Sequence, residues 1–119
     1  ALARARYVGR EGTREVRREH PVAAKVVMQG EASIVRGTID RLVIGVVNDR
    51  PVWAEILDFK TDAVDQSRSA EFAERVAHYE PQMAAYVRTI AASLRLDPSA
   101  VSASLLFVGS DSVVKVASA

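Results

Sequence analysis

Apolar residues recur at strand spacing over most of the first sixty positions of the chain. One such segment runs from about Glu15 to Val27, a longer one from Ser33 to Val47, and a third from Val52 to Leu57. Their β-branched and aromatic content suits β-strands. Pro21, inside the first segment, lacks an N–H donor and therefore favours an edge strand or a bulge. The pattern predicts three consecutive strands.

Turn residues separate these predicted strands. Met28-Gln29-Gly30-Glu31 follows the first segment, and Asn48-Asp49-Arg50-Pro51 follows the second. The second turn joins two apolar runs directly, so we expect an antiparallel hairpin there. Gly37 and Gly45 interrupt the middle strand and indicate bulges or a close approach of another backbone.

The register of this hairpin decides whether two carboxylates meet. An even four-residue loop would place Asp40 opposite Phe59, on the face away from Asp58. An odd register pairing Val46 with Val52, or a bulge with the same effect, instead places Asp40 directly opposite Asp58, with Cβ atoms about 5 Å apart. We predict this second arrangement. Carboxylates at that distance repel, and one is driven neutral unless a cation lies between them.

Asp58 and Lys60 close the third strand, in Glu55-Ile56-Leu57-Asp58-Phe59-Lys60-Thr61-Asp62. Side chains alternate along a strand, so Asp58 and Lys60 share a face, about 7 Å apart along the chain. Charges at the end of a buried strand are costly unless they are paired or bound to an ion. Taken alone, however, Asp-x-Lys favours a solvated ion pair at an exposed strand end, and only the motifs around it change that interpretation.

The second half of the chain changes to helical spacing. Ser69 can cap a short helix through Phe72 and Val76, and Pro81 fits the first turn of a longer helix that ends near Leu96. The longer helix carries a core stripe, and it places two polar side chains four residues apart at the edge of that stripe. The stripe is Met83, Val87, Ile90 and Leu94, and the polar pair is Gln82 and Tyr86.

Two further apolar runs, 101–108 and 113–116, are predicted strands with a turn at 109–111. We expect an α/β fold, with a central mixed β-sheet flanked by helices. A chain of 119 residues makes one domain, so we expect residues 1–119 to form a single unit.

Composition narrows the chemistry that such a domain can perform. The chain has no cysteine and only two histidines, His20 and His78. This excludes disulfides, an iron–sulfur cluster and a cysteine zinc site, so any metal is a hard cation held by oxygen. We interpret His20 as a partly buried strand residue and His78 as a surface residue.

The net charge of +1 conceals a basic N-terminal segment. Six arginines stand in the first twenty positions against three glutamates; the arginines are Arg4, Arg6, Arg10, Arg14, Arg17 and Arg18. This segment is either a phosphate-facing arm or a solvated stretch whose proper neighbours are missing. Because the chain lacks an initiator methionine and begins in mid-pattern, we expect a fragment of a longer protein.

Three short motifs occur in a specific order: Gly37-Thr38-Ile39-Asp40, then Asp58-Phe59-Lys60-Thr61, then Gln82-Met83-Ala84-Ala85-Tyr86. In this order and spacing they resemble the PD-(D/E)xK nuclease superfamily. More narrowly, they resemble the C-terminal nuclease domain of AddA and RecB-type helicase–nucleases (exonuclease V). The stretch Arg18–Val22 is similar to a Glu-x-Pro strand of the same family. The resemblance covers roughly residues 15–108 and implies a restriction-endonuclease-like core.

The resemblance also implies a site and a reaction. Asp40 and Asp58 are expected to bind one or two Mg²⁺ or Mn²⁺ ions, with the backbone carbonyl of Phe59 completing the site. Lys60 is expected to orient the attacking water or stabilise charge on the phosphate. Gln82 and Tyr86 are expected to flank the site and contact substrate or the Lys60 region, or else to hydrogen-bond the helix to its own sheet.

The resemblance also implies a biological role and partners. The resemblance implies a cytoplasmic DNA exonuclease that processes double-strand breaks, with DNA, a helicase region of the parent chain and a second helicase–nuclease subunit as partners. The family normally adds an acidic or histidine ligand from an upstream helix, and Glu11, Glu15, Glu19 and His20 do not fit that role well. The alternatives are therefore a weakly active fragment, a non-catalytic module of the same fold that docks a partner, or coincidental motifs on a sheet protein.

Overall fold

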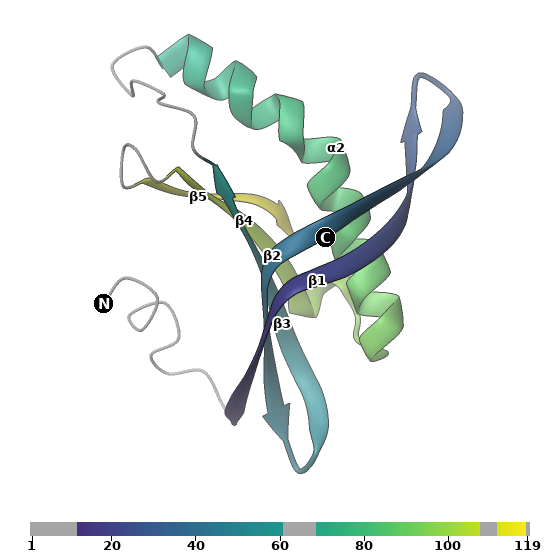
Figure 1. Cartoon of the computed structure of the whole chain (residues 1–119), viewed down its shortest axis with the longest axis vertical. Helices are drawn as coiled ribbons and strands as arrows, with labels where there is room; N and C mark the ends of the chain where they lie inside the picture. The colour runs from purple at the N-terminus through teal and green to yellow at the C-terminus, as the bar shows by residue number, and fades with distance from the viewer. Residues whose placement is uncertain (1–11, 61–68, 108–111, 119) are drawn as a thin grey trace.

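The first three strands form a continuous antiparallel meander in the computed structural model, which describes residues 12–60, 69–107 and 112–118. The strands pair in the order β1-β2-β3-β4-β5, and only the β3–β4 pair is parallel (Figure 1). The mixed α/β fold predicted from the pattern is confirmed. The strands are β1 (Thr13–Met28), β2 (Glu31–Val47), β3 (Arg50–Lys60), β4 (Val101–Phe107) and β5 (Ser112–Ser118).

Both predicted turns are two-residue hairpin loops with left-handed backbone. Gln29 and Gly30 have φ of 52° and 80°, and Asn48 and Asp49 have φ of 51° and 62°. Positive φ at both central positions matches the right-handed twist of the flanking strands. β1 is an edge strand, so Pro21 lies where its missing donor costs little, as predicted.

The β2–β3 register shifts between Gly45 and Val46. Val46 pairs with Pro51, whereas Gly45 pairs with Trp53, so β3 contributes one extra residue. This bulge converts the even loop into the predicted odd register. Gly45 also lies against the indole of Trp53, where an added Cβ would overlap the ring. The glycine therefore allows a close approach, by a side chain rather than by a backbone.

The helical region is one α-helix, α2 (Ser69–Leu94), with Pro81 in its interior. The prediction of two helices divided at Pro81 is wrong. Proline removes one i→i−4 hydrogen bond, but the apolar stripe continues through it without a change of phase. Phe72, Val76 and Tyr79 pack on the same core as Met83 and the residues that follow it. Tertiary packing therefore holds both halves on one axis.

The end of α2 leads the chain back into the sheet. The helix ends at Leu94, two residues before the predicted boundary, because Arg95 adopts a left-handed φ of 57°. The N–H of Leu96 then donates to the carbonyl of Ala91 at 2.8 Å, which satisfies a terminal helix acceptor. Asp97 caps a short 3₁₀ helix, η1 (Pro98–Ala100), which leads directly into β4.

The main core lies between α2 and one face of the sheet. α2 contacts β1, β3, β4 and β5 (Figure 1), and the helix residues predicted to form the core stripe lie within this core or pack against it. A smaller cluster of Val43, Trp53 and Leu57, with Leu106, lies on the opposite face. Within the described ranges, no helix is both long and apolar enough to span a bilayer.

Candidate active site

The end of the β2–β3 ladder away from the Asn48-Asp49 turn brings the predicted carboxylates together. The last ladder pair at this end is Arg41 with Leu57. The next residues along the two strands, Asp40 and Asp58, therefore fall opposite each other. Both belong to the face on which α2 packs, because Leu42 and Ile56, two positions away, lie in the main core. The register prediction is confirmed.

Hydrogen bonds fix the orientation of these side chains. The backbone N–H of Phe59 donates to Oδ2 of Asp40 at 2.8 Å, which ties one strand's carboxylate to the other strand's backbone. Nζ of Lys60 lies 2.7 Å from Oδ2 of Asp58. The side chains of Lys60 and Asp58 are 20% and 13% exposed. The Asp-x-Lys pair is thus mostly buried, which rules out a fully solvated ion pair at this position.

The electrostatics of Asp58 indicate a site that favours added positive charge. Burial raises the pKa of this carboxyl, and the adjoining Asp40 side chain raises it further. Lys60 acts in the opposite direction by hydrogen bonding and charge, but the net direction is upward. The Lys60 ammonium group therefore does not offset the combined effect of burial and of Asp40 on this pKa.

α2 contributes a polar pair next to this cluster. Nε2 of Gln82 donates to the hydroxyl of Tyr86 at 2.8 Å. Tyr86 is only 3% exposed, and its hydroxyl lies against Gly37 of β2, where an added Cβ would overlap it. Burial raises the pKa of Tyr86, and the charge of Asp58 raises it further, while the bond to Gln82 lowers it. The burial of Tyr86 favours a packing role for its ring, whereas Gln82 remains half-buried.

Two contacts were missed by sequence reasoning. Nζ of Lys60 lies 4.0 Å from the ring centroid of Tyr79 on α2. On the other face of the sheet, the guanidinium of Arg41 lies 5.5 Å from the ring centroid of Phe59, and its buried Nε has no hydrogen-bond partner among the described residues. Tyr79 stands three residues before Gln82 on the same stripe, a spacing that would have identified it had the helix not been divided at Pro81.

Comparison with known families agrees with this geometry. A sequence model of the PD-(D/E)XK nuclease superfamily matches residues 1–118. The chain belongs to the PD-(D/E)XK nuclease superfamily. A search of curated proteins found no match. The superfamily assignment agrees with the mixed sheet and with the placement of Asp40, Asp58 and Lys60 at one end of its central hairpin.

The residues considered for a further PD-(D/E)XK ligand lie mainly on β1. Glu15 and Glu19 are exposed there, and His20 is half-buried, as predicted for this histidine. Glu19 falls between the pairs Arg18–Arg41 and His20–Ile39, level with Asp40, but its backbone is left-handed with φ of 50°. Glu11 and Thr61 lie outside the described residues. Across the described part of the chain, no three acidic, histidine or cysteine side chains are placed so that they could hold a metal ion.

The oxygen donors that are present nevertheless suit a divalent cation. Asp40 and Asp58 supply carboxylate oxygens, and Phe59 follows directly with a backbone carbonyl. Mg²⁺ keeps several waters and is commonly held by one or two carboxylates together with substrate phosphates. Carboxylates that meet in a partly buried place, one of them with a raised pKa, are an arrangement that such a cation would neutralise. The site therefore fits Mg²⁺ or Mn²⁺ without a cluster of three protein carboxylates.

Proposed function

We propose that this chain is a nuclease domain that hydrolyses DNA phosphodiester bonds with Mg²⁺ or Mn²⁺. The observation that supports this most strongly is the hairpin register, which sets Asp40 level with Asp58 while Lys60 binds Asp58 at 2.7 Å. Membership of the PD-(D/E)XK superfamily supports phosphodiester hydrolysis as the reaction.

Asp40, Asp58 and the carbonyl of Phe59 would hold the cation in this proposal. A bound divalent ion supplies Lewis acidity toward the phosphate and makes a coordinated water more acidic. The Phe59 N–H orients the Asp40 carboxylate but occupies only one lone pair of its Oδ2, so the remaining lone pairs can bind a cation. Lys60 contributes a positive charge next to Asp58, where it can donate to a phosphate oxygen as negative charge builds up.

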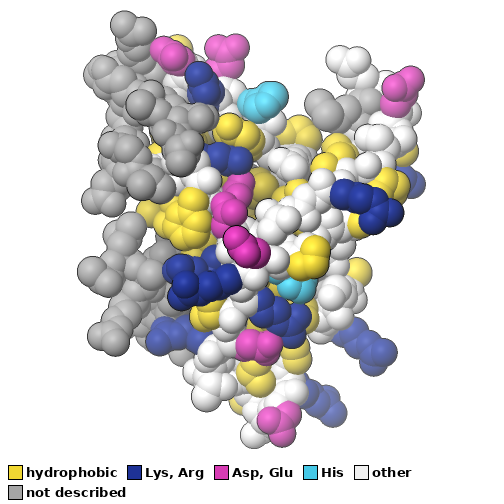
Figure 2. Space-filling model, viewed as in Figure 1, with side chains coloured by type: hydrophobic (Ala, Val, Ile, Leu, Met, Phe, Trp, Pro, Cys, Tyr) yellow, Lys and Arg dark blue, Asp and Glu magenta, His cyan; other side chains and the backbone are white. Residues whose placement is uncertain are grey.

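Gln82 is the polar side chain of α2 best placed to meet substrate beside this centre. It is half-buried, and its amide is held by the buried Tyr86 hydroxyl. One face of the chain also carries side chains of both charges, which suits a DNA ligand. On the face shown in Figure 2, acidic side chains near the centre lie next to Lys and Arg side chains. Basic side chains on such a face can contact the phosphates of a DNA backbone.

The finer assignment follows from the three ordered motifs. Gly-x-x-Asp, Asp-Phe-Lys-Thr and Gln-x-x-x-Tyr together resemble the exonuclease domain of AddA and RecB-type enzymes. We assign the chain to the nuclease part of an ATP-dependent helicase–nuclease that processes double-strand breaks in the cytoplasm. Its partners are then DNA, the helicase region of the parent chain and a second subunit.

A docking module of the same fold is the second candidate. It is favoured by the lack of a third acidic or histidine side chain near Asp40 and Asp58 among the described residues. Against it stands the cost of keeping two carboxylates and a lysine in a largely buried place, which a purely structural copy has no reason to retain.

Lys60→Ala in the parent protein separates the two candidates. The nuclease proposal predicts that DNA degradation falls by on the order of a hundredfold, as is typical when one transition-state donor is lost. Unwinding, assayed in parallel, should be unchanged. Lys25→Ala is the matched control, because Lys25 is exposed on β1, away from the carboxylates. Undiminished degradation refutes the role of Lys60, and loss of unwinding together with degradation favours the docking module.

A further inference from the structure

Lys60 is held from two directions by two different secondary-structure elements. Oδ2 of Asp58, two residues earlier on β3, lies 2.7 Å from its Nζ. The ring of Tyr79, on α2, lies 4.0 Å from the same atom, measured to the ring centroid. A lysine side chain has four rotatable bonds, so one salt bridge leaves the ammonium group free to swing about its partner. A second contact from the helix removes much of that freedom.

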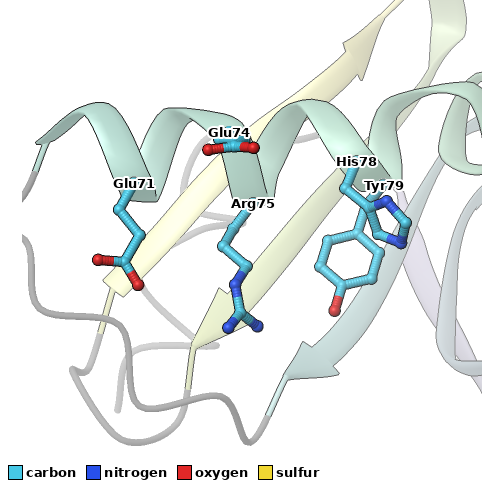
Figure 3. Close-up of a pocket in the computed structure, with 5 residues that line it drawn as sticks. All are labelled: Glu71, Glu74, Arg75, His78 and Tyr79. Atoms are coloured by element: carbon cyan, nitrogen blue, oxygen red, sulfur yellow. The ribbon is translucent and has the colours of Figure 1, made fainter.

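The tyrosine ring is itself held in place. Tyr79 is half-buried and packs against the main core, and the ring of His78 meets it edge-on at 5.3 Å between centroids with an interplanar angle of 72°. These two residues, with Glu71, Glu74 and Arg75, line a pocket of about 510 Å³ along α2 (Figure 3). Tyr79 therefore both lines this pocket and contacts the Lys60 ammonium group.

The chemistry of the contact suits a lysine that must act on a phosphate. An aromatic face attracts an ammonium charge through its quadrupole and places no competing anion beside it. A second carboxylate in the position of Tyr79 would hold Lys60 as well, but it would repel a phosphate. The tyrosine ring thus restrains the ammonium group without adding a second acceptor, so N–H donors not directed at Asp58 remain for substrate oxygens.

We infer that Tyr79 is a positioning residue for Lys60, acting through the lysine and not on the substrate. The inference rests on the proposed function, because it assigns Tyr79 to the turnover step that Lys60 promotes. It also separates Tyr79 from Gln82 and Tyr86, which are hydrogen-bonded to each other.

The contact itself can be tested without any activity. The chain has three lysines, Lys25, Lys60 and Lys115, so their side-chain Hε signals are readily assigned by NMR. A ring face 4.0 Å from Nζ should shift the Lys60 Hε signals upfield of the other two. Tyr79→Phe should preserve this shift, and Tyr79→Leu should remove it. Unshifted Lys60 signals in the wild-type chain overturn the inference, whatever the activity.

Kinetics of DNA hydrolysis with Mn²⁺ test the role. Tyr79→Leu should lower kcat about tenfold with KM unchanged, and Tyr79→Phe should restore wild-type kcat. In the Lys60→Ala background, Tyr79→Leu should have no further effect on kcat, because the two residues act as one unit. Phe72→Leu is the matched control, since Phe72 is a half-buried ring on α2 that packs on Phe107 at 5.2 Å.

The outcomes distinguish this inference from the proposed function. A raised KM with unchanged kcat in Tyr79→Leu means that Tyr79 binds substrate from the pocket, which overturns positioning. Equal loss in Phe72→Leu, or an additive loss in the Lys60→Ala background, means that Tyr79 only supports the fold. If Lys60→Ala leaves hydrolysis intact, the proposed function fails, even where NMR shows the ring contact. A wild-type chain without cation-dependent hydrolysis overturns both.

Discussion

Gly37→Ala probes the contact that sets α2 against β2 next to the carboxylates. A Cβ at position 37 would overlap the Tyr86 hydroxyl, and it would lie 3.3 Å from Cζ of the same ring. Tyr86 is buried and bonded to Gln82, so the ring cannot move without disturbing that bond. Overpacking of this kind costs about 1–3 kcal/mol. Alanine also reduces the conformational freedom of the unfolded chain, which offsets about 0.4–1 kcal/mol of this cost. The free energy of unfolding should therefore fall by about 1–2 kcal/mol.

The Tyr86→Phe background supplies the control. Without the hydroxyl, the nearest atom to the new Cβ is Cζ at 3.3 Å, which a shift of a few tenths of an ångström can accommodate. Gly37→Ala should therefore be close to neutral in that background, although Tyr86→Phe alone costs about 1 kcal/mol by leaving Gln82 without its acceptor. Thermal unfolding of the four proteins measures the cycle, at roughly 3–6 °C per kcal/mol for a chain of this size. Additive losses would refute the proposed contact between Gly37 and the hydroxyl.

Three further predictions concern Asp58 and Pro81. Mg²⁺ or Mn²⁺ should raise the melting temperature of the wild-type chain by binding the native state, and Asp58→Asn should abolish that gain; an unchanged gain would place the cation elsewhere. Because the folded-state pKa of Asp58 is raised, its contribution to stability is fully present below about pH 3.8 and is lost as the pH rises through the folded pKa. In EDTA, Asp58→Asn should therefore stabilise the chain more at pH 7 than at pH 4, and the reverse order would contradict the assigned direction. Pro81→Ala should stabilise the chain by about 1–3 kcal/mol, measured by urea titration, because it restores a hydrogen bond within α2. Destabilisation would mean that packing of the proline ring contributes more than the missing hydrogen bond costs.

Much of the sheet could be predicted because the turn residues, the alternation of apolar positions and the placement of the carboxylates all indicated the same strand pairing. Asn48-Asp49 required a hairpin, and the alternation on each side left only two registers for Asp40 and Asp58. A bulge beside Gly45 selects the register in which they meet, and this glycine marks the position in the sequence. The strand positions of His20 and Pro21 followed from the same alternation.

Contacts between distant elements could not be predicted in the same way. The continuity of α2 through Pro81 depends on a core that both halves of the helix share, and local propensity alone divides the helix there. Because the predicted helix is divided at Pro81, Tyr79 is not placed on the same helix face as Gln82 and Tyr86. The contact between Tyr79 and Lys60 is therefore not predicted. Gly37 could be marked only as a place of close approach, because the Tyr86 hydroxyl reaches it from another element. The parallel pairing of β3 with β4 likewise depends on the path of α2.

The central claim is that Asp40 and Asp58 together form a site for a divalent cation. Crystals of the chain soaked in Mn²⁺, with data collected at the manganese absorption edge, test it most directly. The account predicts an anomalous peak within coordination distance of both carboxylates and of the Phe59 carbonyl, and loss of that peak in Asp58→Asn. A manganese peak at another cluster with none between Asp40 and Asp58, or a peak that persists in Asp58→Asn, would contradict it.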